Sequence, residues 1–336
     1  MLFVPVLLTA CNESGSDIED TQAPLIQLNG ESQVIIGQGR PYNELGATAT
    51  DIVDGIVQVK LPTTSVNTDT LGDYELVYTA SDSQGNQSTA IRIISVVEPR
   101  PFITTWKTDT PGGKSLDNQV TISTKFNDHS YDYNIDWGDG HIDYNQSGDI
   151  THTYAVAGTY TISINDTFPQ LASYSLDEKK LQTLEQWGDI KWESLADTFY
   201  GAQNLTNNAS DTPDLRLVTE FDYMFAEASL FNADLSRWDV SNVTRFYYMF
   251  ENADSFTGDI SSWDISNVTN MVGMFNNLTL TTERYDALLI NWSKQQVQNN
   301  VTFDADNSQF SIEAQAARDI LVVDKNWIID DAGLAP

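Results

Sequence analysis

Apolar residues recur with a period of about 25 residues through the second half of the chain. One copy of the repeat, MFAEASLFNADLSRWDVSNVTRFYY, starts at Met224, the next, MFENADSFTGDISSWDISNVTNMVG, at Met249, and a third opens at Met274. Their apolar side chains follow the spacing i, i+3, i+4, i+7, which places them on one face of a short helix. These positions are Phe221, Met224, Phe225 and Ala228, then Phe246, Met249, Phe250 and Ala253, then Met271, Met274, Phe275 and Leu278. With a degenerate copy at Leu195, the pattern predicts four helical turns in register.

Other positions predict how each helical turn begins and how the turns are joined. Thr219, Thr244 and Thr269 each stand two residues before an apolar stripe, and we expect their hydroxyls to act as N-caps. The segments DLSRWDVSNVT and DISSWDISNVT predict short extended stretches that stack in parallel. Because a unit of this length cannot bury its apolar face alone, the expected fold over 175–336 is an α/β solenoid.

The last residues predict a different, closing structure. Tyr285, Leu288, Leu289 and Trp292 again follow helical spacing, within YDALLINW. A strand-like VTF, a helical SIEAQAARDIL and the segment NWIIDD come after it. These segments are expected to form a C-terminal cap.

The repeat carries a resemblance to a known family. FNADLSRWDVSNVTRFYYMF resembles the BspA-type leucine-rich repeat surface proteins of bacteria, and the similarity covers roughly Trp187 to Asn277. The resemblance implies a leucine-rich-repeat-like solenoid displayed on the cell surface for binding or adhesion. It supplies no catalytic residues.

Two all-β modules are expected before the repeats. Over 23–98, the strand-like runs PLIQLNG, SQVIIGQG, DYELVYTASD and TAIRIISVV are separated by Gly, Asn and Asp turns. GATATDIVDG and YTASDSQGNQST resemble the immunoglobulin-like domains of bacterial surface proteins. Over 101–170, the order WGDG, HTY, GTYT resembles a PKD-type β-sandwich. Two sandwiches followed by the solenoid are therefore the predicted fold class.

Composition narrows the function. The 336 residues carry a formal net charge of −31, with a pI of about 4.1. Nucleic-acid binding is disfavoured because phosphate recognition needs a basic surface, and docking on anionic lipids through protein charge is disfavoured for the same reason. The single cysteine, Cys11, excludes an internal disulfide.

The N-terminal segment 1–22 predicts a truncated lipoprotein signal and an acidic tether. Leu8-Thr9-Ala10-Cys11 fits a bacterial lipobox, in which the cysteine is lipidated, and the polar NESGSDIEDTQ suits a flexible spacer. No basic residue precedes Cys11, so the alternative is a hydrophobic remnant with an idle cysteine. The lipobox predicts attachment to the bacterial cell envelope, at the outer membrane or cell surface, through a lipid anchor only.

Candidate binding residues lie between the apolar stripes. Trp238 and Trp263 are interpreted as core, with an aromatic platform for a glycan as the alternative. Asp239, Arg245 and Asp264 are proposed from their polarity to contact an extracellular protein or glycan.

A calcium site is a second candidate. Asp51, Asp54 and Asp82 could meet at one end of the first sandwich, where clustered oxygens would suit Ca²⁺. The alternative is that all three are turn residues that bind local backbone N–H groups.

No catalytic arrangement is expected. Asp136 and Asp139 could suggest a glycosidase pair, but their Asp-Gly context favours a tight hairpin turn. The predicted function is therefore a non-enzymatic surface lipoprotein that binds a protein or glycan. A structural envelope spacer, or an accessory binding protein of extracellular polysaccharide breakdown, are the alternatives.

Overall fold

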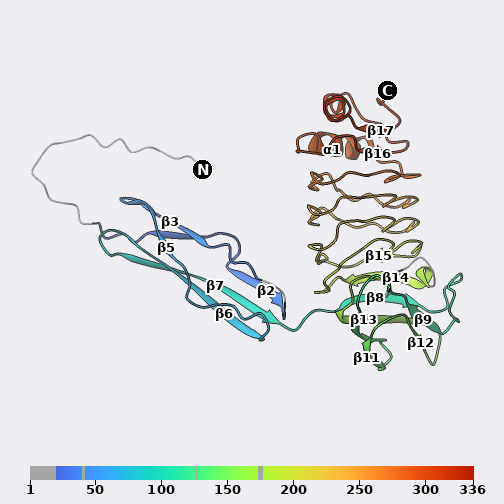
Figure 1. Cartoon of the computed structure of the whole chain (residues 1–336), viewed down its shortest axis with the longest axis horizontal. Coiled ribbons are helices and arrows are strands. Elements are labelled where there is room, and N and C mark those ends of the chain that lie inside the picture. Colours follow the sequence, from blue (N-terminus) through green and yellow to red (C-terminus); the bar gives the residue numbers. More distant parts are fainter. Residues whose placement is uncertain (1–19, 40–41, 126, 173–176) are drawn as a thin grey trace, which may run out of the picture. The chain divides into compact units, whose positions relative to one another are not determined.

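The chain forms two compact units, Met1–Glu98 and Pro99–Pro336, in a computed structural model (Figure 1). The structure describes residues 20–39, 42–125, 127–172 and 177–336. Each unit has its own cluster of buried apolar side chains. The predicted lipidation residue, Cys11, lies outside the described residues.

The first unit consists of two sheets. Its strands are β1 (Leu25–Leu28), β2 (Gln33–Gly37), β3 (Ala47–Asp51), β4 (Gly55–Val57), β5 (Val59–Lys60), β6 (Gly72–Ser81) and β7 (Gln87–Val97). One sheet has the order β1-β3-β4 and the other β2-β7-β6-β5, in which β2 and β7 are parallel. Leu76, Tyr78 and Ile94 form the buried centre. Alternation along β6 and β7 points these side chains inward, as expected for half-buried strands.

The second unit opens with six strands. They are β8 (Phe102–Lys107), β9 (Gln119–Ile122), β10 (Asp132–Asp136), β11 (Ile142–Gln146), β12 (Ile150–Thr153) and β13 (Thr159–Thr167). Ile162 and Ile164 of β13 are buried, as the alternating sequence predicts, whereas Tyr160 is half-buried. The Asp136–Gly140 segment forms the predicted turn: the Oδ1 of Asp136 accepts from Gly138 N, and that of Asp139 accepts from His141 N.

One sheet joins these strands to the repeats. Its order is β11-β10-β13-β8-β14-β15, where β14 spans Leu181–Gln186 and β15 spans Thr206–Asn207. β14 pairs with β8 on one side and with β15 on the other. Rings also cross the junction, since Phe102 contacts Trp192 at 5.1 Å between centroids. The segments 101–170 and 175–336 therefore share one sheet and one hydrophobic core.

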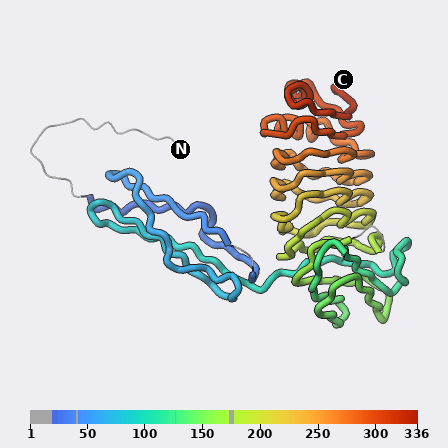
Figure 2. Tube along the Cα trace, viewed as in Figure 1, coloured from blue at the N-terminus to red at the C-terminus, as the bar shows by residue number. Residues whose placement is uncertain are grey.

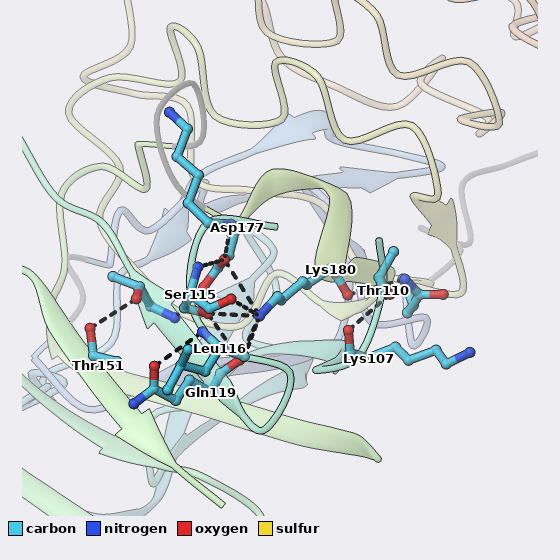
Figure 3. A network of polar contacts seen from close by, with 11 residues as sticks. Lys107, Thr110, Ser115, Leu116, Gln119, Thr151, Asp177 and Lys180 are labelled. Atoms are coloured by element: carbon cyan, nitrogen blue, oxygen red, sulfur yellow. Dashed lines mark hydrogen bonds and ion pairs between the residues drawn. The ribbon is translucent and has the colours of Figure 1, made fainter. Parts of the chain in front are cut away.

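A buried lysine fixes the same junction (Figure 3). Lys180, in the 3₁₀ turn Glu178–Lys180, donates through Nζ to the carbonyls of Ser115, Leu116 and Gln119 at 2.9–3.2 Å. Asp177 lies 3.7 Å away and accepts from Ser115 Oγ at 2.6 Å. Both charged side chains are almost completely buried, so each depends on these partners for solvation.

The predicted α/β leucine-rich-repeat solenoid is wrong. The regular structure of the chain is mainly strand, and among the described residues from 187 to 281 there is no helix. The repeats consist of turns that lie one upon another (Figure 2), connected by isolated bridges such as Glu220 to Arg245 and Arg245 to Asn270. They add neither an α-helical layer nor a continuous solenoid sheet.

The backbone hydrogen bonds explain why the helical spacing does not produce helices. Alternate N–H groups donate to the next repeat: Phe221 to Arg245, Tyr223 to Tyr247 and Phe225 to Met249, at 2.9–3.0 Å. The intervening N–H groups donate instead to the carbonyl three residues earlier, as from Met224 N to Phe221 O. Half of the donors are thus unavailable for the i−4 bonds of an α-helix.

The predicted threonine caps are also wrong. Thr244 donates through both N and Oγ1 to the carbonyl of Thr219, and Thr269 does the same to Thr244. The threonines therefore connect successive repeats and cap no helix. The asparagines of the Ser-Asn pairs act similarly, since Asn267 Nδ2 donates to Ser241 O at 2.7 Å.

The apolar stripe itself is core, as predicted. Phe199, Phe225, Phe250 and Phe275 are buried and stack in turn, with centroids 5.6–5.8 Å apart. A spacing of 25 residues places identical side chains above one another, so each repeat covers the apolar face of the last.

The predicted closing segments form regular elements. They are α1 (Thr282–Trp292), β16 (Thr302–Asp304), α2 (Gln315–Asp319), a π-helical turn (Ile320–Asp324) and β17 (Ile328–Asp330). Thr281 caps α1 by accepting from Arg284 N. The helix buries Tyr285, Leu288, Leu289 and Trp292, the side chains that its sequence spacing selects. No helix in the described residues has the length and apolarity that crossing a membrane requires.

Candidate ligand-binding cleft

Tyrosines gather on one side of the repeats, outside the core. Tyr200, Tyr223, Tyr247 and Tyr248 are all half-buried. By contrast, Trp238 and Trp263 are only 6% and 1% exposed. The aromatic glycan platform suggested for these two tryptophans is therefore wrong, because their rings fill the interior of the stack.

The tyrosine rings contact one another in sequence. Tyr223 and Tyr248 are nearly parallel, with centroids 5.3 Å apart. Tyr247 meets both edge-on, at 5.4 Å and 4.5 Å, and Tyr200 meets Tyr223 edge-on at 6.0 Å. Such offset and edge-to-face pairs are the preferred arrangements of aromatic rings. We call these four residues the tyrosine ladder.

The backbone under the ladder is left-handed. Tyr223 and Tyr248 have φ of 54° and 53°, and the equivalent position of the next repeat is Gly273, with φ of 66°. Positive φ is costly for a bulky side chain and free for glycine. A Cβ on Gly273 would lie 2.5 Å from the ring of Tyr248. Glycine at this position therefore leaves room for the last ring of the ladder.

A cleft of about 520 Å³ opens beside the ladder, lined by Lys125, Asp197, Tyr200 and Tyr223. Lys125 comes from the β-rich segment and Asp197 from the first repeat, and their charged groups are 3.6 Å apart. Burial raises the pKa of Asp197, and Lys125 partly offsets this effect. The cleft therefore lies where the segment after β9 meets the first repeats.

Carboxylates surround the rings. The hydroxyl of Tyr200 donates to Glu227 at 3.2 Å. Burial, followed by the nearby charge of Glu227, raises the pKa of Glu251. Burial, followed by a hydrogen bond with Tyr247, raises the pKa of Tyr223 to about 12. At neutral pH the hydroxyl of Tyr223 is therefore protonated, and its uncharged ring stacks on that of Tyr248.

The predicted polar binding residues lie in two different settings. Asp239 and Asp264 are exposed and accept from the backbone N of Ser241 and Ser266, as turn residues do. Arg245 is exposed but paired: it contacts Glu220 at 3.4 Å and forms an ion pair with Asp222. Of these three residues, only Arg245 neighbours the ladder. Its partner Asp222 also accepts a hydrogen bond from the backbone N of Tyr247, a member of the ladder.

Sequence reasoning missed the tyrosine ladder. The available signal was that Tyr223 and Tyr248 occupy the same repeat position, outside the apolar stripe that forms the core. Their contacts with Tyr200 and Tyr247 could not be deduced, because the alternating hydrogen bonds that orient the rings replace the expected helices.

The first unit contains a group of carboxylates that fits a cation. Single oxygens of Asp20, Asp51 and Asp82 all lie within 4.8 Å of one another. The Oδ2 atoms of Asp20 and Asp51 are buried and have no hydrogen-bond partner. Burial alone would raise the pKa of Asp82, but hydrogen bonds from Asn86, Gln84 and Gly85 lower it below its ordinary value. Hard oxygen ligands and unpartnered buried carboxylate atoms match what Ca²⁺ requires.

The membership of this group differs from the predicted one. Asp51 and Asp82 lie together as expected, but Asp54 does not join them. Its carboxylate accepts from Ser83 N at 2.6 Å and from Ser83 Oγ at 3.0 Å. Asp20 takes the third place, which the sequence could not indicate because Asp20 lies before the first strand.

Two segments match known families. Residues 26–96 match the family described as bacterial surface protein, Ig-like domain. Residues 170–315 match the family described as Mycoplasma protein of unknown function, DUF285. The chain thus carries an Ig-like domain of bacterial surface proteins, and its repeats are similar to a family without an assigned function. No curated protein matches it.

Solved structures give only distant similarities. A lipoprotein from Bacteroides thetaiotaomicron is 19% identical, with 41% of this chain and 60% of that chain covered and a TM-score of 0.20. The CBM51-2 domain in complex with GlcNAc, with INT domains, of Clostridium perfringens ZmpB is 14% identical over 47% of this chain and 46% of that chain, with a TM-score of 0.19. The M60 catalytic domain with both CBM51 domains of the same protein is 16% identical over 43% and 21%, also at 0.19. The chain thus spans less than two thirds of each of them.

Proposed function

We propose that this chain is a non-enzymatic bacterial surface protein that binds an extracellular protein at the tyrosine ladder. The Ig-like segment supports the surface location. The observation that carries the binding proposal is the set of half-buried rings beside a cleft of about 520 Å³. Aromatic side chains in partly desolvated pockets are the usual centres of binding energy.

The side-chain chemistry supports binding in place of catalysis. Asp136 and Asp139 hold the turn after β10, where their oxygens accept backbone N–H groups. The raised pKa of Tyr223 keeps its hydroxyl protonated at neutral pH. A site built from such groups recognises a ligand through contact area and charge, and provides no activated nucleophile.

Substitution of the ladder tests the proposal. Replacing Tyr223 and Tyr248 together by glycine removes two rings and suits the left-handed backbone at both positions. We expect cells that display this variant to lose most attachment to extracellular matrix proteins. Tyr144→Ala is the matched control, because Tyr144 is a 61% exposed tyrosine on β11. If the double variant attaches as well as the control, the ladder is not the binding site.

A glycan ligand is the second candidate. Two nearly parallel rings, Tyr223 and Tyr248, offer faces on which a sugar ring could stack. This candidate corresponds to an accessory role in extracellular polysaccharide breakdown. Retention of the full chain on insoluble polysaccharides, lost in the double glycine variant, would favour it over a protein ligand. An envelope spacer would show neither form of binding.

We further propose that Cys11 carries the lipid that anchors the protein, and that 101–170 is a PKD-type module. The lipobox Leu8-Thr9-Ala10-Cys11 supports the anchor, and the order WGDG, HTY, GTYT supports the module. Labelling cells with a palmitate analogue tests the anchor: the label should be incorporated into the wild type and be absent from Cys11→Ser.

A further inference from the structure

The charges around the tyrosine ladder are unbalanced. Its two basic neighbours already have partners: Lys125 pairs with Asp197, and Arg245 pairs with both Glu220 and Asp222. In the described part of the chain no ion pair joins Glu227 or Glu251 to a basic side chain. Among the described residues, these two carboxylates beside the rings therefore have no basic side chain as an ion-pair partner.

The two acids are neighbours of each other, and Glu227 also contacts a tyrosine hydroxyl of the ladder. Glu227 accepts from the hydroxyl of Tyr200 at 3.2 Å, and its backbone N donates to the carbonyl of Glu251 at 2.7 Å. After burial, the negative charge of Glu251 is one of the causes that raise the pKa of Tyr200, Tyr223 and Tyr248. The two acids thus stand at the same border of the ladder, one repeat apart.

Rings and acids select for the same kind of ligand. The face of an aromatic ring carries negative potential, so an ammonium or guanidinium group above it is attracted. A carboxylate at the border of the ring adds a charge-assisted hydrogen bond to the same cation. A neutral sugar would use the ring faces and leave the two carboxylates partly desolvated and uncompensated.

We infer that the ladder binds a lysine or arginine side chain of a partner protein, with Glu227 and Glu251 as its counter-charges. The inference rests on the proposed function and names its ligand class. A metal ion is a poor alternative here: among the described residues, only Asp20, Asp51 and Asp82 bring three potential ligand atoms close together. The formal net charge of −31 favours the approach of a basic partner.

Binding of a defined peptide to the full chain tests this inference. The probe is an alternating lysine–glycine peptide, compared by calorimetric titration with the same peptide acetylated at each lysine, at about 150 mM salt. We expect acetylation to weaken binding by about tenfold or more, since it removes the charge from each side chain. Equal affinities for both peptides would overturn the inference.

Charge-matched variants separate the site from general attraction. Glu227→Gln with Glu251→Gln should lower affinity for the lysine peptide by about tenfold. Asp234→Asn with Asp259→Asn removes the same charge at exposed turn positions, and should change affinity by less than about twofold. Equal losses in the two double variants would show attraction by net charge only, which contradicts a site at the ladder.

The failure of this inference is distinguishable from the failure of the proposed function. If the tyrosine-to-glycine variant loses attachment while the glutamine variant keeps it, the ladder binds a ligand that is not cationic. If the tyrosine variant keeps attachment, the ladder is not a binding site and both proposals are wrong. Circular dichroism of each variant establishes that it is folded.

Discussion

Two residues of the ladder combine a strained, left-handed backbone with a partly exposed side chain. Tyr223 and Tyr248 keep a left-handed backbone that glycine adopts at the next repeat, and their rings remain half-buried. A strained bulky residue persists only when its surroundings hold it in place, and such residues cluster at functional sites. This combination of a left-handed backbone and partly exposed rings is what the proposed binding role predicts.

Exchanging residues between equivalent repeat positions tests this interpretation. Gly273→Ala should destabilise the protein by about 1–3 kcal/mol, because it adds a Cβ to a left-handed residue 2.5 Å from the ring of Tyr248. Tyr248→Gly should change stability by less than about 1 kcal/mol, since relief of backbone strain offsets the lost ring contacts. Chemical denaturation measures both. A larger loss for Tyr248→Gly than for Gly273→Ala would mean that the ring mainly serves stability.

The acid beside the ladder should make stability depend on pH. The pKa of Glu251 is raised in the folded state, first by burial and then by Glu227. The protonated form of Glu251 is therefore favoured by folding. Its contribution to stability is complete below the ordinary pKa of 4.5 and is lost as pH rises through the folded-state pKa. We expect Glu251→Gln to raise the Tm at pH 7 and to leave it unchanged well below pH 4.5. Asp264→Asn is the control, and an equal rise at both pH values would exclude ionisation as the cause.

At the scale of elements, one lysine holds a loop to a strand. Lys180, immediately before β14, donates to two carbonyls of the loop that leads into β9 and to the carbonyl of Gln119, the first residue of β9 (Figure 3). Lys180→Met should lower the free energy of unfolding by about 3–5 kcal/mol, because it leaves the buried carboxylate of Asp177 and those carbonyls without their positively charged partner. The neighbouring Lys179→Met should cost less than about 1 kcal/mol, since Lys179 is only half-buried. Urea denaturation compares the two, and similar losses would show that the network is unimportant.

Calcium is expected to join three segments of the first unit. Asp20 precedes β1, Asp51 ends β3 and Asp82 follows β6, so a cation would connect chain segments far apart in sequence. At about a hundredfold excess over its Kd, Ca²⁺ should stabilise the folded unit by about 2.7 kcal/mol. Asp51→Asn should abolish this response, while its oxygen can still accept from Val53 N. Asp73→Asn, at an exposed position on β6, is the control. An unchanged calcium response in Asp51→Asn would exclude the site.

The comparison of elements shows where sequence patterns were sufficient. The spacing of Tyr285, Leu288, Leu289 and Trp292 predicts α1, because nothing competes there for the i−4 bonds. The same spacing at Phe221 fails, since N–H groups bond to the next repeat and Tyr223 is left-handed. The sequence spacing predicted which side chains are buried in both α1 and the repeats. It predicted the backbone conformation only in α1. The cleft was unpredictable for the same reason, because the inter-repeat bonds determine where the tyrosines point.

The whole molecule raises the question of how many parts unfold independently. The sequence suggested separate modules over 101–170 and 175–336, whereas β14 pairs with β8 and the two segments share a core. A sheet and a core that cross a boundary couple the segments on its two sides, so they should unfold together. The first unit has its own core and should unfold by itself.

Scanning calorimetry of the full chain should therefore show two transitions in place of three. Calcium should shift only the transition of the first unit, and Lys180→Met only that of the second, which assigns each peak to its residues.

A fragment that ends before Trp187 tests the same coupling. Removing 187–336 should prevent 99–186 from folding, since the deletion exposes the surface of β14 and the ring of Phe102 that Trp187 and Trp192 cover. A stable, cooperative fragment 99–186, or a third peak insensitive to Lys180→Met, would show that the β-rich segment and the repeats are separate domains. The cleft at Lys125 and Asp197 would then lie between two parts that can move, and ligand binding would depend on their docking.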